Sequence, residues 1–284
     1  MEKNTGEEIQ QTNMPWLIVA IPTVPRPNGI DYLSPTINAL YSQISAFDET
    51  DPMHKQIQVF VLSHDRVGIP HKSFNDLKDE YSNHTDTFIF SHVRTKVVAQ
   101  TLDVAHFLKQ VPKSQYVLFM EDDFELCPNG FKAIYHIIQK SNRRFGMNGW
   151  NSVRTSFGLN GILFKNSDDM LNIFANYLEK HADRRPPDHL YTEFAAKETE
   201  EAKQLLGDKT VVGYRYNIFH HLGAVSTLRE SKHWDFPVCW DELLVPTVFE
   251  VEAFNKEKCP KDDLWPKCND EVNEQYPWVQ WFNK

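Results

Sequence analysis

Three adjacent carboxylates, Glu121, Asp122 and Asp123, are the residues of this chain whose types and spacing most directly suggest chemistry. They follow an apolar run at 116–120 that has the length of a buried strand. Like charges this close repel one another, and burial raises the cost of keeping them ionised. A divalent cation removes the repulsion by taking one or two carboxylate oxygens and leaving positions open for phosphate oxygens. The triplet therefore indicates a site for a metal and a diphosphate.

Other interpretations of the triplet remain open at this point. A solvated turn can end a strand with acidic residues that bind nothing. Strand ends rich in acidic residues also serve nucleotidyltransferases and metal-dependent hydrolases. Against those two classes, no second acidic cluster at the spacing of a two-metal site is visible in the sequence. The triplet alone does not separate these functions.

The sequence around the triplet predicts an α/β fold. Apolar runs at 16–21, 57–62, 88–90 and 116–120 predict strands, and amphipathic segments that alternate with them predict helices. This rhythm is typical of a mostly parallel central sheet flanked by helices, whose ligands bind beyond the carboxyl ends of the strands. Pro22, Thr23, Asp65 and the triplet all follow predicted strand ends. We therefore expect them to converge at one edge of the sheet.

The two ends of the sequence and the segment after residue 210 have distinct patterns. Residues 1–14 are polar and acidic and predict a flexible N-terminal tail. The segment from Thr210 to Phe219 predicts one further strand, which leads into His220 and His221. From residue 231 to 284 the composition shifts to Trp, Pro, Cys and scattered charge, which predicts an appendage packed on the main domain. The main domain is therefore expected at 15–230.

Charge and composition bound the partners and the location. The chain has 284 residues and a net charge of −9, which argues against a protein that binds nucleic acid through its phosphates. No stretch approaches the roughly 18 apolar residues of a membrane span, and the first residues do not resemble a signal peptide. Cys259 and Cys268 enclose a short loop suited to a disulfide, and Asn83 begins a glycosylation sequon. These features favour a Golgi or other secretory-pathway lumen, with a soluble cytoplasmic protein as the alternative.

Five segments, in order along the chain, resemble GT-A glycosyltransferases and most closely the N-acetylglucosaminyltransferase IV family, which branches complex N-glycans. The acidic segment is QYVLFMEDDFELCPNGFKAI from Gln115, which is similar to the metal motif of these enzymes. The other four are IPTVPRPNGIDYLSPTINALY from Ile21, VRTKVVAQTLDVAHFL from Val93, RPPDHLYTEF from Arg185 and FHHLGAVSTL from Phe219. Each motif is short, so the resemblance depends on their joint order. It implies a GT-A (Rossmann-like) fold for residues 15–230.

The resemblance also implies an activity. A member of this family is an inverting glycosyltransferase that moves N-acetylglucosamine from UDP-N-acetylglucosamine to a glycan acceptor and depends on a metal, usually Mn²⁺. Asp123 is then expected to ligate the metal, and His221 to add a ligand or contact the diphosphate. Glu121 is expected to hold the ribose or the metal shell, with Asp122 as an acid behind the ligands. Apart from the resemblance, His221 could equally be a hydrogen-bonded histidine at a strand end.

The same resemblance implies a nucleotide pocket before and beside the triplet. The residues expected to line it are Pro22, Thr23, Val24 and Arg26. Asp65 is expected to contact the nucleobase, and Arg94 and Lys96 are expected near the diphosphate. Arg26 can approach a phosphate as a two-pronged donor, although a surface cation in a loop is the other interpretation. Arg94 and Lys96 precede a predicted helix, and one of them could simply be solvated.

Inversion needs a carboxylate base near the acceptor hydroxyl, and Asp188 and Glu193 are the candidates. The family pattern has a second aspartate four residues after the first, where this chain has Thr192. This departure leaves the base and the acceptor open. One alternative is transfer of another UDP-hexose or UDP-N-acetylhexosamine to a glycolipid or protein. Another is an inactive GT-A-like protein that binds nucleotide sugars. Asp188 could also be an ordinary acidic residue at a helix start.

Overall fold

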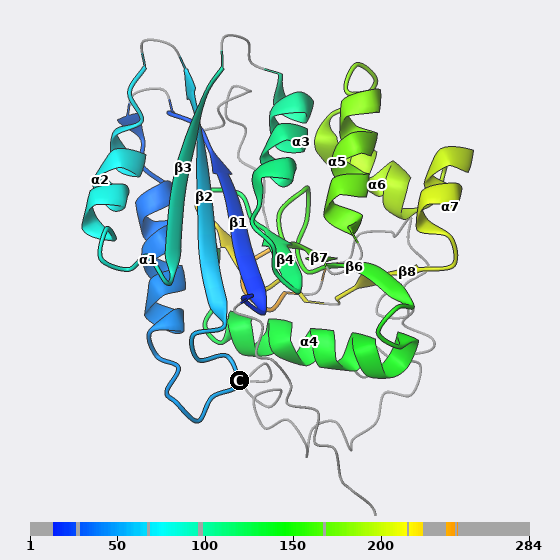
Figure 1. The fold of residues 1–284 in the computed structure, drawn as a ribbon, viewed down its shortest axis with the longest axis horizontal. Coiled ribbons are helices and arrows are strands. Elements are labelled where there is room, and N and C mark those ends of the chain that lie inside the picture. Colours follow the sequence, from blue (N-terminus) through cyan, green and yellow to red (C-terminus); the bar gives the residue numbers. More distant parts are fainter. Residues whose placement is uncertain are drawn as a thin grey trace, which may run out of the picture.

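The computed structural model describes residues 14–26, 29–66, 69–95, 99–166, 169–214, 216–223, 237–241 and 243. Lys96, Cys259 and Cys268 lie outside these residues, as does most of the expected appendage. The described part is built on a seven-stranded sheet with the order β3-β2-β1-β4-β7-β6-β8 (Figure 1). Its strands are β1 (Leu17–Thr23), β2 (Ile57–Arg66), β3 (Phe88–Thr95), β4 (Tyr116–Phe119), β6 (Trp150–Arg154), β7 (Ile162–Lys165) and β8 (Thr210–Gly213).

The sheet is mostly parallel. β1 runs parallel to both β2 and β4, β2 to β3, and β6 to β8, whereas β7 is antiparallel to its neighbours β4 and β6. Helices flank the sheet on both faces. The expected α/β architecture, a mostly parallel central sheet flanked by helices, is therefore confirmed.

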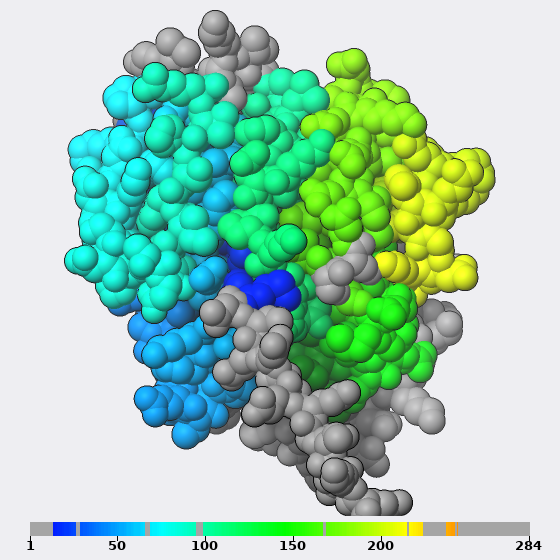
Figure 2. All heavy atoms as spheres, viewed as in Figure 1, coloured from blue at the N-terminus to red at the C-terminus, as the bar shows by residue number. Residues whose placement is uncertain are grey.

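Helices cover the two faces in separate groups (Figure 1). One face carries α1 (Leu33–Ile44), α2 (Lys72–Glu80) and α4 (Gly130–Phe145), and the other carries α3 (Gln100–Gln110), α5 (Met170–His181), α6 (Pro187–Ala195) and α7 (Glu200–Leu206). Figure 2 shows α2 and β3 at one side of the molecule and α7 at the other. Because β1 is buried on both faces, its sequence is a continuous apolar run rather than an alternating one.

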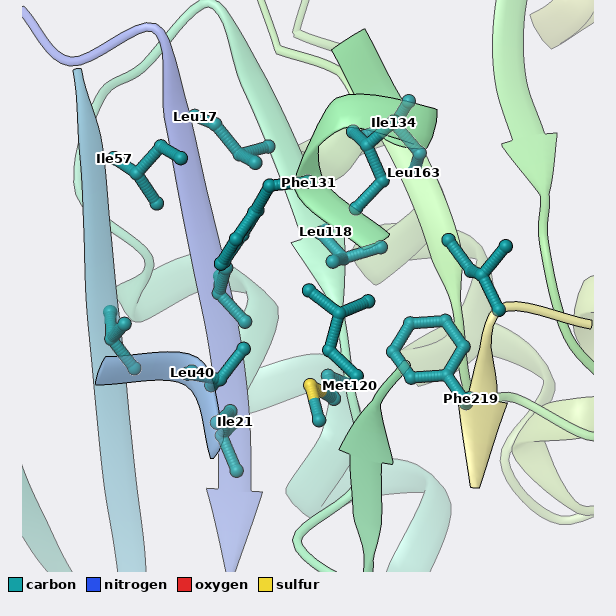
Figure 3. Packing of buried hydrophobic residues seen from close by; sticks show 14 of the residues in the cluster. Leu17, Ile21, Leu40, Ile57, Leu118, Met120, Phe131, Ile134, Leu163 and Phe219 are labelled. Atoms are coloured by element: carbon teal, nitrogen blue, oxygen red, sulfur yellow. The ribbon is translucent and has the colours of Figure 1, made fainter. Parts of the chain in front are cut away.

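One of the two cores reaches the acidic triplet. In Figure 3, Phe131 and Ile134 of α4 lie in the same cluster as Leu118 of β4. The cluster also contains Met120 and Phe219, both 0% exposed. Met120 directly precedes Glu121, and Phe219 stands two residues before His221. Burial of these apolar side chains therefore fixes the backbone on both sides of the expected metal site.

A small second sheet departs from the expectation. β5 (Phe124–Leu126) pairs antiparallel with β9 (Phe219–His221), with Phe124 opposite His221. The prediction of one strand from Thr210 to Phe219 is therefore wrong, because β8 ends at Gly213 in the large sheet. Between the two strands, the buried side chain of Asn217 donates from Nδ2 to the carbonyl oxygens of Phe219 and Pro237, at 2.5 and 2.8 Å. These bonds hold the intervening backbone in a conformation that does not continue β8.

A disulfide joins Cys127, which follows β5, to Cys239, 112 positions later in the sequence. The segment that carries Cys239 is also held by backbone bonds, from Trp240 N to Asn217 O at 2.7 Å and from Asn217 N to Asp241 O at 2.9 Å. The described part of residues 237–241 is thus attached to the turn that precedes β9. No helix in the described part of the chain is long and apolar enough to cross a membrane.

Candidate active site at the centre of the sheet

The acidic triplet lies where the strand order changes direction. The chain builds β1, β2 and β3 outward to one side and then returns to place β4 on the other side of β1. In open α/β sheets, ligands bind beyond the carboxyl ends of the strands at such a point. Thr23 ends β1, and Glu121 follows β4, whose Phe119 is paired with Ala20. The expected convergence of Thr23 and the triplet is confirmed, since Thr23 Oγ1 donates to Asp122 Oδ2 at 2.5 Å.

Asp122 is fully committed to partners within the protein. One carboxylate oxygen accepts from Thr23 and the other from Arg26, and its main-chain oxygen accepts from Thr36 Oγ1 of α1 at 3.1 Å. The residue is 7% exposed. Burial raises the pKa of Asp122 above its ordinary value, and the charge of Arg26 offsets only part of this effect. These contacts fit the expected role of an acid behind the ligands.

Asp123 faces a different set of partners. Its Oδ2 lies 3.6 Å from His221 Nε2 and 3.1 Å from an Arg26 guanidinium nitrogen. A Cβ on Gly223 would lie 2.5 Å from Asp123 Oδ2 and 3.0 Å from His221 Nε2, so only glycine leaves this space open. Burial opposes ionisation of Asp123, but His221 and Arg26 outweigh it and lower the pKa of the carboxyl. The ionised form of the Asp123 carboxylate is therefore favoured beside His221 and Arg26.

The pKa of Glu121 reflects the negative charge of the carboxylates around it. Burial, followed by the charges of Asp123, Asp122 and Asp188, raises its pKa to about 8, while Arg26 acts in the opposite direction. A bound cation favours the ionised form of such a carboxyl. The excess of carboxylates therefore suits a divalent metal.

The donor set for that metal is small. In the parts of the chain that the structure describes, no three His, Cys, Asp or Glu side chains are grouped to hold a metal on their own. Asp123 and His221 nevertheless provide a carboxylate and an imidazole within 3.6 Å of each other. Two protein ligands fit a metal whose remaining positions are filled by diphosphate oxygens and water. The residues are thus compatible with Mn²⁺ bound together with a nucleotide diphosphate.

The two candidate bases lie in different environments on α6. Asp188, in the first turn, has a side chain that is 41% exposed, and its charge contributes to the raised pKa of Glu121. Glu193 is 2% exposed and accepts hydrogen bonds from Tyr177 Oη and Arg184, with Arg185 Nη1 at 3.4 Å. The charge of Asp188 therefore acts on the triplet, whereas the contacts of Glu193 are with α5 and the segment before α6.

The remaining expected pocket residues lie at or just after the carboxyl ends of β1, β2 and β3. Pro22 and Val24 flank Thr23, and the guanidinium carbon of Arg26 lies 4.8 Å from the centre of the Tyr32 ring. Asp65 accepts from Ser63 Oγ at 2.7 Å and is paired in register with Arg94 of β3. Lys96 falls outside the described residues, so its expected role stays a prediction.

Three polar residues at this site were not identified from the sequence. Asn160, fully buried, accepts from the backbone N–H of Glu121 through Oδ1 at 3.0 Å. Arg154 ends β6, and the charge of Asp188 acts on its pKa, which burial lowers. His71 lies 2.9 Å from Thr23 Oγ1 through Nε2. No local motif marks them, because the partners of Asn160 and His71 at the site, Glu121 and Thr23, are distant in the sequence.

Comparisons with known proteins gave fold-level likeness alone. No protein-family model matches the chain, and no curated protein matches it. Among solved structures, residues 1–349 of S. aureus TarS with UDP-GlcNAc match at 16% identity and a TM-score of 0.36, over 50% of this chain and 34% of that one. Across the TarS structures, the chain spans 34% to 60% of the length of the matched chain.

Two further matches have similar scores. The mannosyltransferase PcManGT from Pyrobaculum calidifontis, in complex with GDP-Man and Mn²⁺, has a TM-score of 0.36 at 14% identity, over 65% of this chain and 53% of that one. The 4-diphosphocytidyl-2C-methyl-D-erythritol synthase from Anaerococcus prevotii has a TM-score of 0.39 at 12% identity, over 70% and 87%. These values are too low to assign a function or a residue role.

Proposed function

We propose that the chain is a metal-dependent GT-A glycosyltransferase that transfers a sugar from a UDP-sugar with inversion. As the specific reaction we propose transfer of N-acetylglucosamine from UDP-N-acetylglucosamine to a glycan, of the kind that branches N-glycans. The observation that carries the proposal is the meeting of Asp123, His221 and Arg26 at the point where the strand order reverses. A carboxylate, an imidazole and a guanidinium at that point can together hold a metal and a diphosphate.

The donor side of the site would be divided between two groups of residues. Asp123 and His221 would hold Mn²⁺, which when bound would neutralise charge on the diphosphate leaving group. Arg26 can donate to a phosphate oxygen because its guanidinium already lies beside Asp123, at 3.1 Å. Asp122 keeps that guanidinium in place through a hydrogen bond from the same guanidinium nitrogen that lies beside Asp123.

On the acceptor side, Asp188 is the base that we propose. Its partly exposed carboxylate can reach an acceptor hydroxyl, which the buried carboxylate of Glu193 cannot do. As the acceptor oxygen bonds to the anomeric carbon, the bond from that carbon to the diphosphate oxygen breaks, and Asp188 takes the hydroxyl proton. The leaving UDP carries away the electron pair of the broken bond.

Donor hydrolysis and transfer with a panel of nucleotide sugars test this proposal. The panel contains UDP-GlcNAc, UDP-GalNAc, UDP-glucose and GDP-mannose, each with Mn²⁺ and with EDTA. We expect turnover of UDP-GlcNAc with Mn²⁺ and none with EDTA. Turnover that survives EDTA, or no turnover with any UDP-sugar, contradicts the proposal. Release of pyrophosphate from UTP and a sugar 1-phosphate would instead identify a nucleotidyltransferase.

A second candidate changes the substrate within the same class. Thr192 stands where the similar family has an acidic residue, and its hydroxyl donates to the main-chain oxygen of Asp188 at 3.1 Å. A threonine there supports a different acceptor, such as a glycolipid or a protein, or a different UDP-sugar. A preference for UDP-GalNAc or UDP-glucose in the panel would favour this candidate. Binding of UDP without any turnover would favour an inactive protein that binds nucleotide sugars.

For the compartment, we propose the lumen of the secretory pathway. The disulfide between Cys127 and Cys239 supports it, since such bonds persist mainly in oxidising compartments. The exposed sequon residue Asn83, in the turn that precedes β3, agrees with it. Digestion of the cellular protein with an N-glycosidase checks the location. A shift in mobility is expected, and colocalisation with cytosolic markers would contradict the proposal.

A further inference from the structure

A chain of hydrogen bonds links the start of α2 to the acidic triplet. His71 Nε2 lies 2.9 Å from Thr23 Oγ1, and Thr23 Oγ1 lies 2.5 Å from Asp122 Oδ2. Asp122 accepts from Arg26 through its other oxygen. These residues come from the N-terminus of a helix, the end of β1, the segment after β4 and the loop after β1. Thr23 and Arg26 therefore contact the Asp122 carboxylate directly, and His71 contacts it through Thr23.

The direction of each proton in this chain is determined by its partners. His71 Nδ1 accepts from the backbone N–H of Phe74 at 3.3 Å, so in the neutral ring the proton is on Nε2. The single hydroxyl proton of Thr23 goes to Asp122, because an ionised carboxylate can only accept. Thr23 must then receive a proton from His71 Nε2. Burial lowers the pKa of His71, which agrees with a neutral ring that donates through Nε2.

This series of hydrogen bonds ends at Arg26, the residue that we propose to contact phosphate. An Arg26 guanidinium nitrogen bonds Asp122 Oδ1 and lies 3.1 Å from Asp123 Oδ2. If Asp122 rotates, Arg26 loses the contact that holds it beside Asp123. A hydroxyl that both donates to Asp122 and accepts from His71 restricts that rotation.

We propose that His71 is a positioning residue for donor binding, because it holds the Thr23 hydroxyl on Asp122 and so fixes Arg26 beside the metal-binding carboxylate. This inference rests on the proposed function, since the ligand it assigns to Arg26 is the diphosphate of a UDP-sugar. His71 itself touches neither the donor nor Asp123. Its effect on binding passes through Thr23 and Asp122.

His71 also caps α2, and a test must separate the two roles. Serine is a good N-cap residue but is too short to reach Thr23, so His71→Ser keeps the cap and removes the donor. Thr23→Val removes the hydroxyl with little change in shape, whereas Thr23→Ser keeps the hydroxyl and is the matched control. If His71 acts through Thr23, His71→Ser and Thr23→Val should lose the same support of the Asp122 carboxylate.

The measurement is calorimetric binding of UDP in the presence of Mn²⁺, with the melting temperature recorded for every variant. We expect Thr23→Val and His71→Ser to raise the Kd about tenfold, the loss typical of a group that supports a metal site from behind. Thr23→Ser should stay within about twofold, and Thr23→Val combined with His71→Ser should bind no worse than Thr23→Val alone. The expected signature is weaker UDP binding by variants that still unfold in one cooperative transition above the temperature of the binding measurement.

Two results would overturn the inference and leave the proposed function intact. Wild-type affinity for UDP in His71→Ser and Thr23→Val would show that the hydrogen bonds from His71 through Thr23 to Asp122 do not position Arg26. Independent, additive losses in the double variant would show that His71 does not act through Thr23. If the wild-type protein binds no UDP with Mn²⁺, the proposed function fails and the inference fails with it. The two failures are distinguishable, because in the first the wild type binds UDP and the variants bind it equally well, whereas in the second the wild type itself does not bind UDP.

Discussion

The Oδ2 atom of Asp123 and the Nε2 atom of His221 lie 3.6 Å apart, at one end of the two-stranded β5–β9 sheet. The backbone N–H of Leu222 donates to the main-chain oxygen of Asp123 at 2.8 Å, which extends the pairing beyond the strands. The imidazole also packs on Phe124, with ring centres 4.6 Å apart. Strand pairing and ring packing therefore place His221 beside the acid, and the neighbouring His220 is directed elsewhere.

This placement allows a comparison between adjacent histidines. His221→Ala should weaken Mn²⁺-dependent UDP binding about tenfold or more, because it removes one of two protein ligands of the metal. His220→Ala is the matched control, since His220 is half exposed and lies 3.4 Å from Glu125. Titration calorimetry with and without Mn²⁺ measures both. Equal affinities of the two variants for UDP with Mn²⁺ would show that His221 is not a ligand of the metal.

Asp123 should be needed for metal and donor binding. Asp123→Asn keeps the shape of the side chain and removes the charge, and we expect kcat/KM with UDP-GlcNAc to fall at least about a hundredfold. Glu125→Gln, two residues further on β5, is a control that should stay within about twofold. Initial rates over a range of Mn²⁺ concentrations measure the effect. Retention of full activity by Asp123→Asn would contradict the assignment.

Asp188 should affect turnover rather than donor affinity. Asp188→Asn should lower kcat by about 10² to 10⁴, the usual contribution of a general base, with the Kd for UDP within about twofold of wild type. Asp183→Asn, an exposed acid before the same helix, is the control. Transfer rates and calorimetry together decide between the two effects. An unchanged kcat would leave the reaction without the base we propose.

Glu193 should contribute to stability and to its pH dependence. Burial opposes ionisation of Glu193, but bonds from Arg184 and Tyr177 outweigh it and lower the pKa below that of the unfolded chain. The stabilisation is therefore fully present above the unfolded pKa of about 4.3 and is lost as the pH falls through the folded value.

Glu193→Gln removes these charged hydrogen bonds and should lower the free energy of unfolding at pH 7 by about 2 kcal/mol. The difference from wild type should shrink at low pH. Urea unfolding at pH 7 and below pH 4 measures it. A difference that stays constant across this range would contradict the ionised pair.

The disulfide should stabilise the fold. Cys127→Ser combined with Cys239→Ser should lower the free energy of unfolding by about 2–4 kcal/mol, since the bond closes a long loop of the unfolded chain. Urea unfolding of this variant and of the wild type, with and without reductant, measures the effect. Reductant should destabilise the wild type alone. Destabilisation of both proteins by reductant would point to the cysteines at 259 and 268.

The sequence predicts the centre of the fold better than its edge. β1 and β4 are buried on both faces, so their apolar runs identify them directly. β6 contains the buried polar residues Asn151 and Ser152, which bond each other, and Ser152 also contacts the distant Tyr191. No apolar run marks this strand. The shift of β9 out of the large sheet depends on Asn217, whose bonds also involve distant residues.

A similar division holds for the site. The convergence of Thr23 and the triplet follows from parallel strands, whose carboxyl ends share one edge. The choice between Asp188 and Glu193 required the structure, because five residues along a helix turn a side chain by about 140° to another face. His71 was missed because its contact with Thr23 depends on where α2 begins. Neither a motif nor a periodic pattern reports that position.

The order of the strands has a consequence for how the protein is made. Every strand of the seven-stranded sheet has left the ribosome once Gly213 emerges, whereas β9 and His221 come later. We therefore expect a nascent chain that has just completed its sheet to carry the acidic triplet without its histidine partner. Competence to bind a metal would be acquired after the main core, in a separate and later step of maturation.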